Sequence, residues 1–330
     1  MSSNLSPSQP AKGEDRALLP LRSLGRTSLM VTSVCVGGSP LGSLPQVFGE
    51  EVDYERGLQT VRHVFDSQVN FLDTSNGYSN GDSERRIGAV IAERGGLPPS
   101  FVLATKVDPD PRTGDYSGDR ARRSAEESLQ RLGVSQFQLL YLHDPEVIRF
   151  EEAMAPGGPV EALVELRRSG AAQYIGVAGG PVDLMTRFVR TGVFDVLLTH
   201  NRFTLVDRTA DQLITEAAEA GLGVVNAAVY GGGILAKGTG HSDKYAYSQA
   251  SPELLNLVRE IERLCERYGV PLRAVALRMS TRDPRVGSTV VGTASPAHVD
   301  ELVDLISREI PDGLWEELSA LGTPEAGRIS

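Results

Sequence analysis

The sequence predicts a closed α/β barrel in which eight parallel strands are each followed by a helix. Short apolar runs alternate with amphipathic helical patterns from about residue 31 onward. Most of these runs are continuously apolar, which is typical of strands buried on both faces. Eight such runs are found, the number of strands that closes a parallel barrel. A chain of 330 residues is long enough to form one such domain.

The expected strands begin roughly 22–40 residues apart up to the seventh, a spacing that suits strand–helix units. In chain order they are Val31–Gly37, Phe71–Asp73, Val102–Lys106, Gln138–His143, Tyr174–Val177, Val196–Thr199, Gly223–Ala228 and Ser288–Val291.

Helical patterns fill the gaps between these strands. In the first of them, Leu58, Val61 and Phe65 fall on one apolar stripe. Ser83 is expected to cap the second helix, because serine hydroxyls accept hydrogen bonds from helix N-termini. The expected helices are Tyr54–Asp66, Ser83–Glu93, Asp119–Leu132, Val160–Ser169, Val182–Arg190, Ala210–Ala220 and Pro252–Tyr268.

Three segments fall outside the regular alternation. Residues 1–18 are rich in Ser and Pro and lack the apolar core of a signal peptide, so we expect a disordered leader before a single domain over residues 19–330. Leu19–Thr27 resembles a hairpin that closes the barrel floor. The Gly- and Ser-rich stretch Tyr230–Ala250 is expected to form a long loop at the mouth of the active site.

Composition restricts the partners. The formal net charge is −10 and no lysine or arginine cluster is present, which argues against a nucleic-acid partner. The two cysteines are too few for a disulfide framework and fit a reducing, cytoplasmic location. The most apolar stretch is short and interrupted by glycines, so no membrane contact is expected. We therefore expect a soluble protein with a small-molecule substrate, either a monomer or a small homo-oligomer.

Three of the expected strands end in polar residues suited to proton transfer. Asp73 and Tyr78 follow the second strand, Lys106 ends the third and His143 ends the fourth. In a parallel barrel these ends meet on one face. A tyrosine with an ordinary pKa near ~10 needs help to act at neutral pH, and a nearby ammonium group lowers that pKa. We expect Lys106 to lower the pKa of Tyr78, Asp73 to keep Lys106 charged, and His143 to donate a hydrogen bond to the substrate oxygen.

Other interpretations of these residues remain open at this stage. Asp73 and Lys106 could be a structural ion pair, and His143 could be a hydrogen-bonded core histidine. A metal site formed by His143, His200 and Asp73 is a third possibility. Metal-dependent barrel hydrolases usually carry a His-x-His pair on the first strand, which this chain lacks, so no metal is expected.

Two later segments have the features of cofactor-binding loops. Gly231–Ala236 fits the pattern G-x-G-x-x-A, but more loop follows instead of the helix of a Rossmann unit, so a glycine-rich loop against a cofactor in another fold is the better interpretation. Ser295 is a plausible N-cap for the helix after the last strand. Helix N-termini in the last barrel loops often bind phosphate, although an ordinary capped helix is an equal alternative.

From Leu21 to Leu321 the chain resembles the aldo-keto reductase superfamily. The resemblance rests on four motifs: Leu72–Tyr78, Ala104–Lys106, Ser128–Gly133 leading to Leu140–His143, and Ile175–Val177. It implies a (β/α)₈ (TIM) barrel that binds NAD(P)(H) without a Rossmann domain. It also implies a catalytic tetrad of Asp73, Tyr78, Lys106 and His143, with Tyr78 as the acid/base.

His200–Leu205 and Asn226–Ala236 are similar to the aldose 1-dehydrogenase branch of that superfamily, which includes L-fucose, D-threo-aldose and L-galactose dehydrogenases. The implied reaction is oxidation of an aldose, or a similar hemiacetal or alcohol, at C1 to a lactone. The alternative is an NADPH-dependent aldehyde or ketone reductase. A non-enzymatic, cofactor-sensing subunit is a third hypothesis, which the intact tetrad disfavours.

The same resemblance implies a set of cofactor contacts. Many members carry Ser-Asn after the fifth strand, where this chain has Ala178 and Gly179, and the cations that grip a 2′-phosphate correspond to Gly292 and His298. Loss of those cations should weaken NADP(H) more than NAD(H), so NAD is favoured. The expected contacts are Asp73, Ala178, Gly179, His200, Tyr230, Gly231, Gly233, Ile234, Gly292, Thr293, Ser295, His298 and Glu301.

Overall fold

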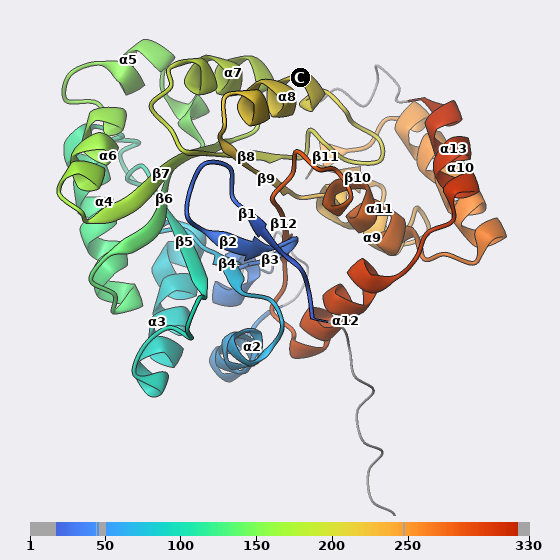
Figure 1. Ribbon diagram of the computed structural model, residues 1–330, viewed down its shortest axis with the longest axis horizontal. Helices are drawn as coiled ribbons and strands as arrows, with labels where there is room; N and C mark the ends of the chain where they lie inside the picture. The colour runs from blue at the N-terminus through green and yellow to red at the C-terminus, as the bar shows by residue number, and fades with distance from the viewer. Residues whose placement is uncertain (1–17, 44, 46–50, 247, 323–330) are drawn as a thin grey trace, which may run out of the picture.

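The computed structural model describes residues 18–43, 45, 51–246 and 248–322 and contains a closed barrel of eight parallel strands. The strands lie at the centre, and helices surround them (Figure 1). The leader expected over residues 1–18 falls outside the described residues except for its last position. The barrel strands are β3 (Val34–Gly37), β4 (Phe71–Asp73), β5 (Val102–Val107), β6 (Phe137–His143), β7 (Ala172–Gly179), β8 (Val196–His200), β9 (Gly223–Ala227) and β12 (Ser288–Gly292).

The strand order confirms the predicted fold. From β3 to β9 each strand pairs in parallel with the next along the chain. Strand β12 then closes the ring by pairing with both β9 and β3. Because all eight strands run in the same direction, their carboxyl ends form one face of the barrel.

A hairpin precedes the barrel, as expected, but its second strand starts later than predicted. Strands β1 (Leu21–Ser23) and β2 (Met30–Thr32) pair antiparallel. The expected first strand Val31–Gly37 is therefore wrong at its start, because its first two residues belong to the hairpin and Ser33 separates them from β3. Leu24 at the hairpin turn packs beside Gly223, the first residue of β9, so the hairpin covers the amino ends of the strands.

Helices follow the strands, and their ends have identifiable caps. Ser117 caps α4 through a bond from the Arg120 amide, and Gly133 ends it with a positive φ of 67°. Ser83 is not a cap, contrary to expectation, since its helix begins one residue earlier and its hydroxyl is buried against Gly38. The larger helices of the ring are α2 (Tyr54–Asp66), α3 (Asp82–Arg94), α4 (Gly118–Leu132), α6 (Pro159–Arg168), α7 (Val182–Arg190), α8 (Asp211–Glu219) and α12 (Pro296–Ser307).

The long loops carry further elements, several of which the sequence did not predict. The stretch expected as loop, Tyr230–Ala250, contains two short helices and a two-stranded hairpin. The additional elements are η1 (Ser39–Gly42), η2 (Tyr78–Gly81), η3 (Pro145–Val147), α5 (Phe150–Met154), η4 (Gly231–Gly233), α9 (Ile234–Lys237), β10 (Lys244–Tyr245), β11 (Ser248–Gln249), α10 (Pro252–Tyr268), α11 (Leu272–Thr281) and α13 (Asp312–Leu321).

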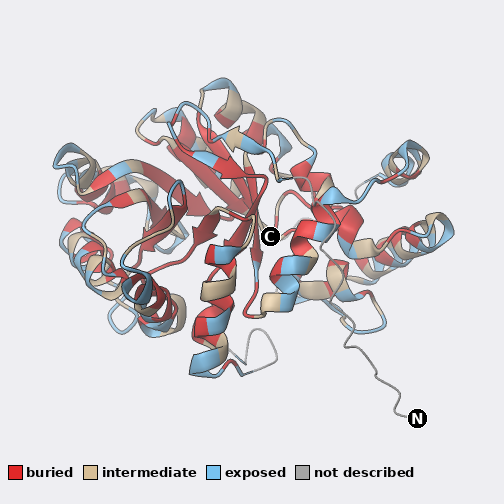
Figure 2. Cartoon of the chain, turned by 60° about the horizontal axis from the view of Figure 1, so that its bottom comes forward, coloured by how far each residue is buried: buried red, intermediate tan, exposed pale blue. Residues whose placement is uncertain are grey.

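The core has two parts, which Figure 2 shows as the buried strands and the inward faces of the helices. One cluster fills the barrel interior and includes Cys35, Phe71 and Tyr141, each with 0% of its surface exposed. The larger cluster lies between the strands and the helical ring. Cys35 and Cys265 are both buried and unpaired, so no disulfide links them.

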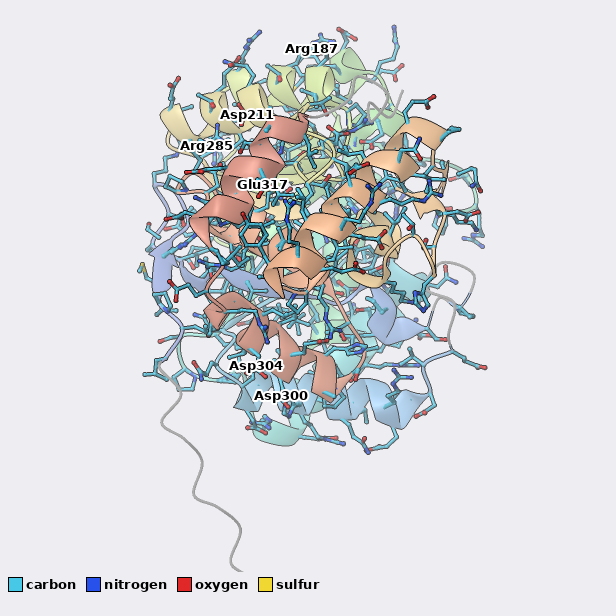
Figure 3. The ribbon with its side chains drawn as sticks, turned by 90° about the vertical axis from the view of Figure 1, so that its right-hand side faces the viewer. Arg187, Asp211, Arg285, Asp300, Asp304 and Glu317 are labelled. Atoms are coloured by element: carbon cyan, nitrogen blue, oxygen red, sulfur yellow. The ribbon has the colours of Figure 1, made fainter. Side chains whose placement is uncertain are left out.

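Charged side chains cover the outer helices. Figure 3 faces α10, α12 and α13 and labels several of these residues. Arg285 and Asp211 form an ion pair of 2.8 Å that joins the chain before β12 to α8. Among the described helices, none is long and apolar enough to cross a membrane.

Candidate active site

Four polar side chains predicted from the sequence meet at the carboxyl ends of neighbouring strands. Asp73 is the last residue of β4, Lys106 lies one residue before the end of β5, and His143 is the last residue of β6. Tyr78 begins η2 on the loop that follows β4. The register brings these ends together, since Asp73 pairs with Ala104 and Lys106 pairs with Tyr141.

Lys106 is the centre of this group. Its Nζ donates to Asp73 Oδ2 at 2.6 Å, to the Thr74 carbonyl oxygen at 2.7 Å and to the Tyr78 hydroxyl at 3.1 Å. An ammonium group has three donors and accepts nothing, so these three bonds use all its donors. The Tyr78 oxygen is the acceptor in its contact with Lys106, which leaves the phenol proton free to be donated elsewhere.

The electrostatics of the group differ in one respect from the sequence expectation. Burial alone would lower the pKa of Lys106, but the charge of Asp73 and the contact with Tyr78 raise it, so the ammonium stays charged. Removal of water from around the phenol raises the pKa of Tyr78, and Lys106 lowers it only part of the way back. The expected net lowering of the Tyr78 pKa is therefore wrong for these surroundings, and Tyr78 keeps its proton at neutral pH.

Hydrogen bonds between Asn76 and helix α4 hold the loop that carries Tyr78. The side-chain amide of Asn76 donates to the Ser124 carbonyl and to Glu127, both at 3.0 Å. Arg120 donates to the side-chain oxygen of Asn76 at 3.2 Å, and Arg131 donates to its backbone oxygen at 3.0 Å. Because Asn76 is only 4% exposed, these bonds replace contacts with water and fix the loop two residues before Tyr78.

His143 has a carboxylate partner that the sequence reasoning missed. Its Nδ1 lies 2.6 Å from Asp108 Oδ1, and each of these side chains is 13% exposed. Asp108 follows Lys106 by two residues, and side chains two apart along an extended chain point to the same side. That alternation was the available indication that Asp108 would lie among the tetrad residues.

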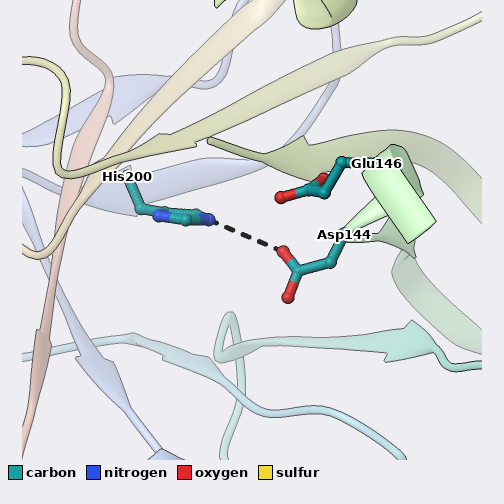
Figure 4. Close-up of side chains that lie close together, drawn as sticks. All are labelled: Asp144, Glu146 and His200. Atoms are coloured by element: carbon teal, nitrogen blue, oxygen red, sulfur yellow. Dashed lines mark ion pairs between the residues drawn. The ribbon is translucent and has the colours of Figure 1, made fainter. Parts of the chain in front are cut away.

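A second group lies beside His143 on the rim; the sequence reasoning named one of its members, His200, as a cofactor contact and a possible metal ligand, and missed the other two. Asp144, Glu146 and His200 point toward one another, with His200 Nε2 at 3.5 Å from Asp144 Oδ1 (Figure 4). Burial alone would raise the pKa of Asp144, but the imidazoles of His143 and His200 lower it to about 2. The carboxylate is thus ionised at neutral pH and available to accept hydrogen bonds.

The metal alternative loses its ligands in this arrangement. Asp73 is bound by Lys106, and Nδ1 of His143 is bound by Asp108. The remaining member, His200, is paired with Asp144. Candidate ligand atoms of Asp144, Glu146 and His200 do lie within 4.8 Å of one another, but Glu146 is exposed, and exposed acidic groups commonly gather without an ion. We assign no metal to them.

Ala178 and Gly179, expected after the fifth barrel strand, are instead the last two residues of that strand, β7, and the structure explains why glycine stands at 179 and 180. A Cβ atom on Gly179 would lie 3.0 Å from Glu146 Oε2, and one on Gly180 would lie 2.9 Å from His200 Cε1. Larger side chains at these positions would displace the two polar groups. The small residues therefore make room for Glu146 and His200 at the rim.

Other predicted cofactor contacts lie on the loop after β9. Tyr230 is half-buried, and Gly231–Gly233 form η4 with three positive φ angles. At Gly233 a Cβ would meet no described atom within 4 Å, so its bare backbone faces open space. Ile234 is wholly buried, backbone included, so it presents no exposed surface to a cofactor.

The remaining predicted contacts follow β12. Ser295 occupies the N-cap position of α12, but its side chain makes no capping bond, contrary to the simple cap expected. Thr293 lies 3.5 Å from His298 through Oγ1 and Nδ1. Glu301 pairs with Arg273 of α11 at 2.6 Å. Gly292 is exposed at the end of β12.

These residues fit a nicotinamide dinucleotide. Within the described part of the chain, no hydrogen-bond donor reaches Asp73 Oδ1, although that atom is buried beside the tetrad. A ribose hydroxyl would satisfy it. No side chain caps the N-terminus of α12, so its backbone N–H groups could donate hydrogen bonds to a phosphate group. At Gly233 the absence of a side chain would allow a phosphate group to approach the backbone closely. Among the described residues, no hydrogen bond or ring contact links Tyr230 directly to the tetrad.

Comparison with known proteins gives consistent matches along the chain. The family model described as "Aldo/keto reductase family" matches residues 33–322. An L-galactose dehydrogenase from Arabidopsis thaliana is 30% identical over 300 residues, which cover 90% of this chain and 91% of that protein. A D-threo-aldose 1-dehydrogenase from Pseudomonas sp is 29% identical over 317 residues, which cover 88% of this chain and 94% of that protein.

Two further matches extend the comparison. A pyridoxal 4-dehydrogenase from Microbacterium luteolum is 28% identical over 338 residues, covering 91% of this chain and 97% of that protein. Among solved structures, the holo form of an aldo-keto reductase from Bacillus halodurans superposes with a TM-score of 0.77 at 19% identity. It covers 94% of this chain and 100% of its own, which supports the barrel fold.

Proposed function

This chain belongs to the aldo/keto reductase family of NAD(P)-dependent oxidoreductases, and on that premise we propose that it oxidises an aldose at C1 to the lactone. The observation that carries the proposal is the Lys106 ammonium, which bonds both Asp73 and the Tyr78 hydroxyl at the rim of the barrel. This arrangement places a protein-bound proton carrier next to a fixed positive charge, as proton transfer at an alcohol or carbonyl oxygen requires.

In the proposed reaction the cyclic hemiacetal binds with its C1 hydroxyl group facing Tyr78 and His143, whose ring centroids are 5.6 Å apart. When bound, the oxidised cofactor supplies a hydride acceptor and a positive charge. Tyr78, as the phenolate that Lys106 stabilises, accepts the proton of the C1 hydroxyl group as C1 gives up its hydride. Asp73 keeps Lys106 charged and in place. His143 orients the reacting oxygen.

The proposed substrate class is supported by the relatives and by the rim. Two relatives bear the names of aldose and galactose dehydrogenases, at 29% and 30% identity. Asp144, Glu146 and His200 lie directly beside His143 and present two carboxylates and an imidazole. Carboxylate oxygens accept hydrogen bonds from hydroxyl groups, so this part of the rim suits a polyhydroxylated substrate.

We propose NAD⁺ as the favoured cofactor. Position 292 is glycine and position 298 is histidine, so neither supplies a fixed cation at the end of β12. Two cations lie nearby: Arg273 is paired with Glu301, and Arg56 donates to the Ala294 carbonyl oxygen at 3.0 Å. A 2′-phosphate placed there would compete with these protein partners for charge-assisted hydrogen bonds, which are about twice as strong as neutral ones.

The test is turnover of the purified chain with NAD⁺ and NADP⁺ against a panel of aldoses that includes D-threo-aldoses and L-galactose. We expect reduction of NAD⁺ with at least one aldose and lactone as the product. The absence of sugar oxidation with either cofactor, together with NADPH-dependent reduction of aldehydes, would contradict the proposal.

A reductase acting on aldehydes or ketones is the second candidate, because Tyr78 keeps its proton at neutral pH. A neutral phenol is a proton donor, as carbonyl reduction requires. The two candidates differ in the pH at which each direction is fastest and in the cofactor used. The same substrate panel, run with NADH and NADPH and with aldehydes, separates them.

A further inference from the structure

Asp108, which lies outside the tetrad, connects two parts of the candidate active site, His143 and the loop that carries Tyr78. Its Oδ1 lies 2.6 Å from Nδ1 of His143. Its Oδ2 accepts a hydrogen bond of 2.7 Å from the Gly77 amide and a further short one from the Ser75 hydroxyl. Gly77 and Ser75 belong to the loop that carries Tyr78. One carboxylate thus holds the histidine with one oxygen and the tyrosine loop with the other.

The contacts determine where the protons lie. The bonds from His143, Ser75 and Gly77 lower the pKa of Asp108 below its ordinary value although burial alone would raise it, so the carboxylate is ionised. An ionised carboxylate only accepts hydrogen bonds, so His143 has to carry a proton on Nδ1. The Ser75 oxygen, 3.1 Å from the same nitrogen, gives its own proton to Asp108 and offers only lone pairs to His143.

This fixed proton decides what the other ring nitrogen can do. A neutral imidazole with its proton on Nδ1 has a lone pair on Nε2, and Nε2 becomes a donor only after a second proton binds. The backbone of His143 is held as well, because the Tyr116 hydroxyl lies 2.9 Å from its amide and 2.7 Å from its carbonyl oxygen. A turn of the ring about the Cβ–Cγ bond would break its contact with Asp108, so the two nitrogens keep their roles.

We propose that Asp108 is a positioning residue that holds His143 in its Nδ1-protonated form, so that Nε2 accepts a hydrogen bond from a second hydroxyl group of a polyhydroxylated substrate, next to the C1 hydroxyl group that gives its proton to Tyr78. This revises the expectation that His143 donates to the substrate, which would hold only for the imidazolium form. The inference rests on the proposed function for its substrate, but the proton assignment itself does not depend on turnover.

The charged groups around His143 set the pH at which the role of Nε2 changes. Asp108 faces Nδ1, and Asp144 lies 3.7 Å from Nε2. Lys106, beyond the Tyr78 ring, opposes them, with Asp73 bound to its ammonium. His200 touches Asp144 from the other side. Burial alone would lower the pKa of His143, but the two neighbouring carboxylates raise it above its ordinary value.

The protonation state of His143 should therefore favour oxidation of the substrate at high pH and reduction at low pH. Above its pKa, His143 is neutral, and Nε2 can accept a hydrogen bond from the second hydroxyl group of a sugar while the C1 hydroxyl group gives its proton to Tyr78. Below its pKa, His143 is an imidazolium, and Nε2 can donate to the carbonyl oxygen of a substrate that is to be reduced. Removal of the Asp108 charge should move both profiles toward lower pH.

The experiment is a ¹⁵N NMR titration of the histidine rings in the full-length protein, which has five histidines. His143→Gln identifies the signals of His143 by their loss. In the wild type we expect the neutral ring to carry its proton on Nδ1. In Asp108→Asn we expect the pKa of His143 to fall by about one to three pH units, as for loss of a neighbouring opposite charge. Asp119→Asn, an exposed change of the same kind, is the matched control and should leave it unchanged.

A wild-type ring protonated on Nε2 in its neutral form would overturn the inference without any variant, so a folding defect in Asp108→Asn cannot hide the answer. An unchanged His143 pKa in a folded Asp108→Asn variant would also overturn it. The pH profile of kcat/KM for oxidation should follow the NMR pKa in both proteins, and Asp108→Glu should restore part of the shift. If no aldose is oxidised, the proposed function fails, while the NMR result still decides the role of Asp108.

Discussion

Replacing Lys106 by methionine leaves the Asp73 carboxylate buried with no cation beside it. The two side chains are 1% and 4% exposed, and their charged atoms are 2.6 Å apart. Methionine has a similar length but no charge, so packing changes little while the ion pair disappears. Removal of one partner of a buried pair typically costs about 3–5 kcal/mol. We expect Lys106→Met to lower the free energy of unfolding at neutral pH by about that amount.

The loss should depend on pH in a defined direction. Without Lys106, the pKa of Asp73 in the folded state rises further above its unfolded value of about 4. Below the unfolded pKa of about 4 the carboxyl group is neutral in both states, so the penalty is absent there. It grows as the pH rises toward the folded pKa, at about 1.4 kcal/mol per pH unit. A total of 3–5 kcal/mol therefore needs roughly two to four pH units, and the deficit should be complete between about pH 6 and pH 8.

The assay is urea denaturation of wild type and Lys106→Met between pH 4 and pH 8. Lys244→Met is the matched control, because Lys244 is exposed on β10. The double variant Asp73→Asn/Lys106→Met removes both charges and should recover a large part of the lost stability. The reasoning is refuted if Lys106→Met is as stable as Lys244→Met at pH 8, or if the double variant is no more stable than Lys106→Met.

Three further changes test other parts of the structure. Tyr78→Phe removes the hydroxyl group that Lys106 binds at 3.1 Å. Turnover should fall by about 10²–10⁴-fold, while the cofactor Kd from fluorescence titration stays the same. Retained turnover would reject Tyr78 as the acid/base. Gly88→Ala places a Cβ 1.9 Å from the Arg131 carbonyl oxygen between α3 and α4, so urea unfolding should show a loss of about 1–3 kcal/mol. Gly240→Ala, which meets no described atom within 4 Å, should show almost none, and equal stability of the two variants would contradict the packing argument. His298→Arg adds a cation after β12 and should tighten NADP⁺ binding about tenfold or more, since a hydrogen bond to a charged group contributes about 1.5–3 kcal/mol. His298→Gln is the control. Unchanged NADP⁺ affinity in His298→Arg would place the 2′-phosphate elsewhere.

Much of the barrel could be predicted from sequence because its strands are buried on both faces. Strand β4 and helices α2, α7 and α10 have the predicted bounds. Helix α11 was missed for a physical reason: most of its residues from Ala274 to Thr281 are buried, so it shows no alternation of polar and apolar faces. Strands β10 and β11 have only two residues each, too few to show a periodic pattern in the sequence.

The tetrad could be predicted because each of its residues lies at or near the end of a strand, where the topology alone fixes its neighbours. His200 ends strand β8, but Glu146 lies on η3 in the loop after β6, and strand order does not determine where that loop places Glu146. The net pKa of Tyr78 likewise could not be derived from the presence of Lys106. It depends on how far burial opposes the ammonium charge, which is a property of the packed structure.

The buried charges under the Tyr78 loop are better explained by positioning than by stability. Glu84 has 0% of its surface exposed and binds Thr105 at 2.7 Å and Arg131 at 3.1 Å. Buried ion pairs of this kind are often no more stabilising than apolar residues of similar volume. Arg131 also holds the backbone oxygen of Asn76, two residues before Tyr78. A packed apolar cluster has no directional donor with which to fix that backbone oxygen, whereas a guanidinium group provides several in one plane. The network therefore sets the position of the phenol relative to Lys106, and that position is the quantity on which the proposed proton transfer depends.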